Sequence, residues 1–369
     1  MNLKMQSPVG AHTTFNGREY DYFAGCGYLG LQNHPAVLQA AQQTLQEYGL
    51  STATSRGGYG EHPIYDELEK QACAFFGAEK VVYFASGYLG MTILTQTSNL
   101  AKDHFFIDSQ SHYSLWDAAQ VTNKPITVYP HLDPERLMEI LNHELQPQEH
   151  PIVLSDGVFP VSGEIAPLPA YLKILKPYNG FIFLDDAHAL GVMGEHGRGT
   201  AEHFNINNDH CRTTGTLSKA LGGWGGVIWG KTNWIENVDR NSRVMAGASP
   251  PPLPMAAASA RALEIVRSSP DLRLKLRQNV SQAREGFRKL GWEIEISPVP
   301  IICLSARDGV DLSKIREGLF EQGIAVEFVH SYTSSPPGGA LRIAVFATHS
   351  AEQIDRLINV SATLIKFQQ

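Results

Sequence analysis

The sequence predicts an α/β protein, in which a mostly parallel sheet forms a large domain and a smaller α+β domain follows it. The chain has 369 residues, of which 43% are hydrophobic and 18% are charged. That length exceeds one ordinary domain and allows a sizeable core. Short apolar runs alternate with helical patterns, which is typical of a parallel sheet covered by helices. The runs occupy residues 81–84, 105–107, 152–154 and 181–184.

The segment after Asn33 predicts one of the covering helices. Asn33 is a suitable N-cap, and Pro35 fits the first turn of a helix. Apolar residues then recur at helical spacing between Val37 and Tyr48, and Gly49 ends the pattern. We therefore expect a helix with one buried face here.

A proline-rich run divides the chain near residue 250. The sequence Ser-Pro-Pro-Pro-Leu-Pro at residues 249–254 breaks any regular element. We expect an N-terminal segment over residues 1–35, a large domain over 36–250 and a small C-terminal domain over 251–369. Within the last we expect helices at 255–290, at 312–322 and at the C-terminus, and strands at 293–296, 301–304, 324–328 and 341–346.

Bulk properties exclude several classes of function. A net charge of −7 and the lack of a basic run argue against a nucleic-acid partner. No apolar stretch is long enough to cross a bilayer, and the first residues do not resemble a secretory signal. We therefore expect no membrane insertion and a cytoplasmic location. The four cysteines lie far apart without a Cys-x-x-Cys pair, which predicts reduced thiols and no metal site.

The glycine-rich segment at residues 215–226 carries the strongest signal for chemistry, because Lys219 lies inside it. A lysine that forms a Schiff base has to lose its proton, which desolvation or a neighbouring cation favours. Glycines let the backbone approach a phosphate-bearing cofactor, and Thr216 offers that phosphate a hydroxyl. The alternative is a surface turn with a solvated lysine.

A second signal follows the apolar run at residues 181–184, where Asp185 and His188 come next. Ligands of open α/β sheets bind at the carboxyl ends of the strands. If the cofactor is pyridoxal 5′-phosphate (PLP), Asp185 is placed to keep its pyridine nitrogen protonated, and His188 to donate to its phenolic oxygen. The alternative is a polar strand end with a capping aspartate.

Two other predicted strands end in weaker signals. Residues 81–90 run from a strand through Ser86, Gly87 and Tyr88 into a helix, whose free N–H groups suit a phosphate. His112 follows the run at 105–107 and can lie flat on a planar ring. Simple helix capping and a structural histidine are the respective alternatives.

Taken in order, these motifs resemble those of the α-oxoamine synthases, the PLP-dependent acyltransferases that include 8-amino-7-oxononanoate synthase and glycine C-acetyltransferase. The resemblance covers nearly the whole chain. Its motifs lie at residues 28–31, 55–56, 68–69, 86–87, 112, 185–188, 191–192, 197–199, 216, 219, 341–343 and 349.

This resemblance implies fold type I of the aminotransferase superfamily, with a seven-stranded, mostly parallel sheet and a homodimer that shares its sites. It implies that Lys219 binds PLP and that His112 stacks on the ring. It also implies that Asp185 pairs with the pyridine nitrogen and His188 with the phenolic oxygen. The remaining residues of the implied cofactor cradle are Ser86, Gly87, Tyr88 and Thr216.

The implied reaction is a decarboxylative condensation of an amino acid with an acyl thioester, which gives an aminoketone. On the substrate side the resemblance implies that Arg342 grips the amino-acid carboxylate, with Thr333 and Cys26 beside it. Another PLP reaction, such as transamination, aldol cleavage or decarboxylation, is an alternative because a fold does not fix the reaction. A PLP-binding protein without turnover is the third hypothesis.

Several residues depart from the family pattern. Cys26 and Pro160 stand where the family has an asparagine and a serine, Ala248 replaces a threonine, and Tyr65 replaces a histidine. We interpret the first two as lost hydrogen bonds to the substrate carboxylate and predict poor use of glycine. Tyr65 is our candidate for a replacement hydroxyl. The family's basic N-terminal helix is also not found here.

Overall fold

The largest sheet of the protein has seven strands and is mostly parallel, as expected. The computed structural model describes residues 3–98, 102–333 and 335–368. In spatial order the strands are β3 (Lys80–Phe84), β9 (Gly226–Gly230), β8 (Cys211–Thr216), β7 (Phe181–Asp185), β6 (His150–Asp156), β4 (Asp103–Asp108) and β5 (Ile126–Tyr129). All neighbours pair in parallel except β9, which is antiparallel to both β3 and β8. The four apolar runs that predicted strands form β3, β4, β6 and β7.

Helices cover both faces of this sheet because its strands are buried on both sides. Ile152 and Leu154 of β6 belong to one core cluster, whereas Val153 between them belongs to another. The first cluster includes side chains of α3 (Gly90–Thr97), α4 (Tyr113–Gln120) and α8 (Thr232–Asn241). The second includes side chains of α5 (Pro134–Glu144) and α6 (Leu168–Leu175). The short elements of this region are η1 (Arg56–Gly60), η2 (Gly87–Leu89), η3 (Lys176–Tyr178), α7 (Thr200–His203) and α9 (Arg243–Gly247).

Three long helices flank the sheet near β3. They are α1 (Pro35–Tyr48), α2 (Pro63–Phe76) and α10 (Leu253–Ser268), and α10 packs against the other two. The helix expected after Asn33 is α1, but His34 caps it, because its Nδ1 accepts the N–H of Ala36 at 3.2 Å. Gly49 ends α1 with a φ of 76°. None of the described helices is long and apolar enough to cross a membrane.

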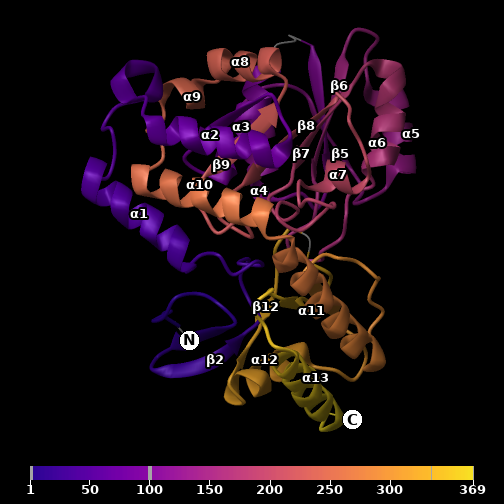
Figure 1. Ribbon diagram of the computed structural model, residues 1–369. Coiled ribbons are helices and arrows are strands. Elements are labelled where there is room, and N and C mark those ends of the chain that lie inside the picture. Colours follow the sequence, from indigo (N-terminus) through magenta and orange to yellow (C-terminus); the bar gives the residue numbers. More distant parts are fainter. Residues whose placement is uncertain (1–2, 99–101, 334, 369) are drawn as a thin grey trace.

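The C-terminal part forms an antiparallel sheet covered by helices. The sheet consists of β10 (Ile301–Ser305), β13 (Ala340–Ala344) and β12 (Glu327–Val329), in that order. Its helices are α11 (Pro270–Lys289), α12 (Leu312–Glu321) and α13 (Ala351–Lys366), and they lie below the large sheet in Figure 1. The large and smaller units agree with the predicted fold class. The limits of the units near residues 35 and 250 remain a proposal, since α10 follows the second limit and still contacts α1 and α2.

Three expectations for this part were wrong. The helix expected at 255–290 is divided into α10 and α11, because Pro270 has no N–H to continue the first helix. Residues 293–296 form no strand: Ile294 packs against the core, but Ile296 is 89% exposed, so the two apolar residues do not share a buried face. The strand expected at 324–328 is two short strands, β11 (Ile324–Ala325) and β12, which pair in different sheets.

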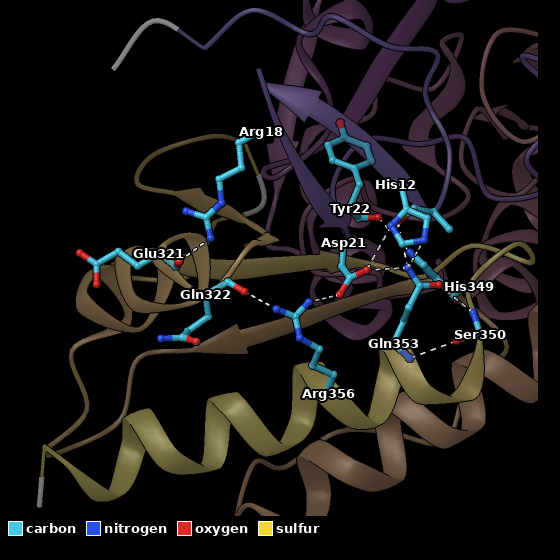
Figure 2. A network of polar contacts seen from close by, with 11 residues as sticks. His12, Arg18, Asp21, Tyr22, Glu321, Gln322, His349, Ser350, Gln353 and Arg356 are labelled. Carbon is cyan, nitrogen blue, oxygen red and sulfur yellow. Dashed lines mark hydrogen bonds and ion pairs between the residues drawn. The ribbon is translucent and has the colours of Figure 1, made fainter. Parts of the chain in front are cut away.

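The N-terminal hairpin belongs with the C-terminal helices. Its strands are β1 (His12–Phe15) and β2 (Arg18–Tyr22), and β2 pairs in parallel with β11. Figure 2 shows how the buried carboxylate of Asp21 ties this hairpin to α13: it pairs with Arg356 and accepts from Gln353 Nε2 at 2.8 Å. On the same side, buried His349 contacts the carbonyl oxygen of Tyr22 at 2.9 Å. The two chain ends are therefore held together by polar contacts.

We predict that Asp21→Ala lowers the free energy of unfolding by about 1.5 to 3 kcal/mol, the range for hydrogen bonds to charged groups. The substitution removes the carboxylate that Arg356 and Gln353 share, and leaves them their contacts with the carbonyl oxygens of Gln322 and Ala11, respectively. Urea unfolding followed by circular dichroism measures the change. The control is Glu264→Ala, which breaks the exposed pair with Arg261 and should cost no more than about 0.5 kcal/mol. Equal losses in the two variants would contradict a tethering role for Asp21.

Candidate active site

A cavity of about 310 Å³ lies at the carboxyl edge of the seven-stranded sheet. Strands β6, β7 and β8 end there with Asp156, Asp185 and Thr216. The cavity is lined by all eight predicted cofactor residues, which are Ser86, Gly87, Tyr88, His112, Asp185, His188, Thr216 and Lys219. Its other lining residues are Ala85, Ser114, Asp156, Ala187, Ser218 and Trp224. Residues from five separate segments of the sequence thus meet in one place.

Lys219 lies at the start of a chain of hydrogen bonds. Its Nζ is 2.8 Å from Nε2 of His188, and Nδ1 of His188 is 2.8 Å from the hydroxyl of Tyr28. Burial, followed by the charge of Lys219, holds the pKa of His188 well below its usual value, so the ring is neutral. A neutral imidazole has one donor and one acceptor nitrogen, and here each nitrogen has a partner. The two contacts therefore fix the orientation of the imidazole.

Two carboxylates face each other across neighbouring strands. Asp156 and Asp185 are partners in the register of β6 and β7, and both are buried. Burial raises the pKa of Asp185, and the charge of Lys219 opposes the shift. Burial and then the charge of Asp185 raise the pKa of Asp156 well above its usual value. Asp185 Oδ1 accepts the N–H of Ala187 at 2.9 Å, whereas we find no hydrogen bond to its Oδ2 from the described residues.

His112 is held at the start of α4. Its ring Nδ1 accepts the backbone N–H of Ser114 at 3.2 Å. The backbone N–H of His112 donates to Asp156 Oδ2 at 2.8 Å. Burial lowers the pKa of His112 to about 4, and the charge of Lys219 acts in the same direction. The ring is therefore neutral and points into the cavity that Lys219 also lines.

The turn after β3 forms the wall opposite Thr216. Gly87 lies so close to Thr216 that a Cβ at position 87 would be 2.6 Å from Cβ of Thr216. The hydroxyl of Ser86 does not cap the helical turn that follows, and no other hydrogen bond of it is found among the described residues. Tyr88 directs its hydroxyl to Asp117 Oδ2 at 2.5 Å, so only its backbone and ring remain for the cavity. Thr216 donates to the carbonyl oxygen of Gly225 at 2.9 Å.

Comparison with known proteins agrees with this geometry. The model of the family "Aminotransferase class I and II" matches residues 26–360. An 8-amino-7-oxononanoate synthase from Thermoanaerobacter pseudethanolicus is 31% identical over 351 residues, which are 95% of this chain and 89% of that protein. A serine palmitoyltransferase from Bacteriovorax stolpii is 33% identical over 351 residues, covering 95% and 83% of the two chains. The chain belongs to the PLP-dependent α-oxoamine synthase family.

A solved structure gives the same result for the fold. The serine palmitoyltransferase of Sphingomonas wittichii superposes with a TM-score of 0.92 and 25% sequence identity, covering 100% of this chain and 92% of the other. Fold type I, with its seven-stranded large domain and smaller C-terminal part, is therefore confirmed. So is the expected class, a PLP-dependent C-acyltransferase of the α-oxoamine synthases.

The residues in the cavity fit PLP. The open Oδ2 of buried Asp185 is suited to a protonated ring nitrogen, because a buried carboxylate gains from a cationic partner. Ser86 offers a free hydroxyl, and the missing side chain of Gly87 lets this turn pack directly against Thr216, so that the backbone of the turn lines the cavity. Lys219 is the lysine that lines the cavity. This fit supports the cofactor cradle expected from the sequence, whose individual roles we propose below.

The residues expected on the substrate side lie next to this cavity. Arg342 of β13 is buried, and its Nη2 is 3.3 Å from the hydroxyl of Tyr28 and 3.7 Å from Sγ of Cys26. Thr333 belongs to the loop before β13, in which the ring of Tyr332 lies 6.0 Å from that of His112. The Oγ1 atom of Thr333 is buried without a hydrogen-bond partner in the described part of the chain. Cys26, Arg342 and the Thr333 loop are thus neighbours of the cofactor cavity.

Other residues of the site were not predicted from the sequence. Asp156 ends β6 as Asp185 ends β7, so the rule that selected Asp185 would also have found it. Tyr28 was noticed only as part of a motif, because its contacts with His188 and Arg342 span 160 and 314 residues. Tyr65 does not serve as the replacement hydroxyl we considered, since it is buried and donates to the carbonyl oxygen of Pro251 at 2.6 Å.

We predict that Gly87→Ala weakens PLP binding while the fold is kept. The added Cβ would lie 2.6 Å from Cβ of Thr216, so this turn and Thr216, which both line the cavity, have to move apart. We expect the dissociation constant to rise by about tenfold or more. Titrating the apoprotein with PLP and following the visible absorbance measures it. Gly247→Ala is the control, because a Cβ there meets nothing within 4 Å. Parent-like affinity in Gly87→Ala would contradict a close approach of the cofactor to this turn.

Proposed function

We propose that this protein condenses an amino acid with an acyl thioester, releasing carbon dioxide and a free thiol and forming an aminoketone, with PLP held on Lys219. The observation that carries the proposal is the single cavity in which Lys219, His188, Asp185 and His112 meet. Membership of the α-oxoamine synthase family supports the reaction type. A cytoplasmic location remains a prediction from the sequence.

Each side chain of the cavity has a distinct task in this proposal. When bound, PLP supplies a ring that accepts the electron pair released at the Cα of the amino acid. Asp185 would hold the ring nitrogen in its protonated form through its open Oδ2. His112, neutral and fixed by Ser114, covers one face. Ser86, Gly87, Tyr88 and Thr216 contribute the phosphate side of the cradle.

Lys219 is also the proposed carrier of protons. Its Nζ is held by the neutral Nε2 of His188 at 2.8 Å, which orients the amine without competing with it for a proton. An amine in this position can take a proton from the substrate Cα and return it to the product. His188 in turn is set by Tyr28, so Tyr28 is a positioning residue for the lysine.

Arg342 is our candidate for the group that binds the substrate carboxylate, together with Thr333 and Cys26. A guanidinium has five N–H donors, and here all three of its nitrogens already have acceptors within the protein. The acceptors are the carbonyl oxygens of Pro160 (2.7 Å) and Gly25 (3.1 Å), the Tyr28 hydroxyl (3.3 Å), Oε2 of Glu327 (3.4 Å) and Sγ of Cys26 (3.7 Å).

An incoming carboxylate therefore has to displace part of this shell. The two longest contacts, to Glu327 and Cys26, are the easiest to give up. Glu327 is 51% exposed and carries the same charge as the carboxylate that would replace it. We propose that this competition makes glycine a poor substrate. The replacement of the family's asparagine and serine by Cys26 and Pro160 would act in the same direction.

We also propose that the protein acts as a homodimer. Large apolar side chains are exposed on α1 and the segment that follows it, at the outer edge of the molecule in Figure 1. They are Leu38, Leu45, Tyr48, Leu50 and Tyr59, the last of which is 100% exposed. An apolar patch of this kind is suited to a second copy of the chain.

The reaction itself is tested by thiol release. We expect free thiol to appear when the protein is given one particular amino acid and an acyl thioester from a series of increasing chain length. Transamination, aldol cleavage and simple decarboxylation release no thiol, so the readout separates these reactions from acyl transfer. Lys219→Ala should abolish the release and the lysine-bound cofactor that borohydride fixes. Thiol release at the parent rate in that variant would overturn the assignment of Lys219.

We predict a dissociation constant for glycine above about 1 mM, and a tighter one in Glu327→Gln. Removing a half-exposed competing charge is worth about 1 kcal/mol, or about fivefold in affinity. Spectral titration of the PLP-loaded protein with glycine, alanine and serine measures it. Glu317→Gln is the control. Glu317 lines a third cavity together with Glu327, but we find no contact between Glu317 and Arg342 in the described structure. A parent constant below about 1 mM, or identical constants in both variants, would contradict the competition.

The dimer is tested by sedimentation. At micromolar concentration the parent should be a dimer, and a charge placed in the apolar patch, as in Leu50→Glu, should shift it toward monomers by at least about tenfold in the dissociation constant. Ile296→Glu is the matched control, since Ile296 is also highly exposed but lies in the C-terminal part. A parent that is monomeric and fully active would refute the shared site.

A further inference from the structure

A second cavity lies at the opposite edge of the seven-stranded sheet from Lys219. Its volume is about 450 Å³, and it is bordered by the first residues of β7 and β8 and by α8. In Figure 1, α8 lies at the end of the molecule farthest from the C-terminal helices. No part of the proposed reaction uses this cavity.

The central group of the second cavity is the guanidinium of Arg212. It lies between two aromatic rings, with its central carbon 3.6 Å from the ring centroid of Trp234 and 4.6 Å from that of Phe181. Burial lowers the pKa of Arg212 to about 10, and the charge of Asp209 opposes that shift. The side chain therefore stays cationic at neutral pH although it is largely removed from water.

Arg212 is charged, but the described residues offer its guanidinium no hydrogen bond or ion pair. Within residues 3–98, 102–333 and 335–368, we find no hydrogen bond or ion pair of its guanidinium, and none of its nitrogens is sealed from solvent. The two carboxylates in the lining are both paired with lysines: Asp209 with Lys231 at 2.5 Å, and Asp103 with Lys124 at 2.6 Å. Among the described residues, no carboxylate of this lining is thus in ion-pair contact with Arg212, although the charge of Asp209 still acts on it.

The surroundings of Arg212 favour an anion with an apolar part. The aromatic rings cover the faces of the guanidinium, so its N–H groups remain at the edges, where carboxylates and phosphates bind in a forked geometry. Asn233 adds a donor, because its oxygen already accepts the N–H of Trp234 at 2.7 Å and leaves the amide nitrogen. Trp229 and Phe183 provide apolar walls in the same cavity.

We propose that this second cavity binds a small organic anion, with its carboxylate or phosphate group on Arg212 and its apolar part against Trp229 and Phe183. The site lies on the strands that reach the candidate active site. Phe181 and Asp185 are the two ends of β7, and Thr216 is four residues from Arg212 along β8, about 13 Å. A ligand here therefore contacts the same two strands that position Asp185 and Thr216.

Two probes, benzoate and inorganic phosphate, test the proposal on the PLP-loaded protein, in which the cofactor occupies the other phosphate site. Trp229 and Trp234 border the cavity, so we expect saturable quenching of tryptophan fluorescence, confirmed by calorimetry. Benzoate should bind more tightly than phosphate because it also covers the apolar walls. In Arg212→Gln the dissociation constants should rise by tenfold or more.

Arg240→Gln is the matched control, since Arg240 is an exposed arginine of α8 that pairs with Glu236 at 3.0 Å. Its dissociation constants should equal those of the parent. Arg212→Met, which keeps an apolar stem between the two rings, should also lose binding while its thermal unfolding stays close to that of the parent. Absence of saturable binding with both probes, or parent-like binding in Arg212→Gln and Arg212→Met, would overturn the proposal.

Discussion

A chain of hydrogen bonds links the lysine of the candidate active site to the smaller sheet. It runs from Lys219 through His188 and Tyr28 to Arg342, with successive distances of 2.8, 2.8 and 3.3 Å. Lys219 follows β8 of the large sheet, whereas Arg342 belongs to β13 of the smaller one. Because buried polar groups are stable only when each has a partner, the position of the lysine depends on how the two parts of the fold meet. The proposed proton transfer by Lys219 and the proposed binding of the substrate carboxylate by Arg342 are therefore coupled through Tyr28.

Burial sets the protonation states around that chain. It raises the pKa of both carboxyl groups, Asp156 and Asp185, and lowers the pKa of both imidazoles, His112 and His188. All four shifts favour the uncharged forms, as expected when groups are removed from water. A cationic partner stabilises a buried carboxylate, and the protonated ring nitrogen of PLP is such a partner for Asp185. The raised pKa of Asp185 is thus consistent with a site that binds PLP.

Two arginines show how differently one side chain is used. Arg342 is surrounded by acceptors on all three nitrogens, so a substrate carboxylate has to compete for it. Arg212 is stacked between Trp234 and Phe181, and the described residues offer its N–H groups no acceptor. The arrangement around Arg342 favours selectivity among substrate carboxylates over affinity for them. The arrangement around Arg212 leaves its N–H groups available to an anionic ligand. In each case, the surroundings of the arginine include residues that lie far away in the sequence.

The sequence by itself determined four strands of the large sheet, the fold class and several residues that line the candidate active site. Lys219, Asp185, His188 and Gly87 could be predicted because each follows a local signal, a glycine-rich turn or the carboxyl end of an apolar run, and such ends meet at one edge of a parallel sheet. The break between α10 and α11 also follows from the sequence, because Pro270 has no N–H to continue a helix. By contrast, the alternating residues 293–296 look like a strand, and only the structure shows that Ile296 has no core to enter.

Tertiary structure alone decided the contacts between distant segments. Tyr28 reaches His188 across 160 residues and Arg342 across 314, and Arg342 meets Glu327 because β12 and β13 pair in one particular register. Arg212 and Trp234 are likewise brought together by the placement of α8, which packs against α3, β3 and β9. Local sequence patterns indicate which functional groups are present and which face of a helix or strand they occupy. The choice of partner depends on packing and register, which are properties of the whole fold and not of any segment.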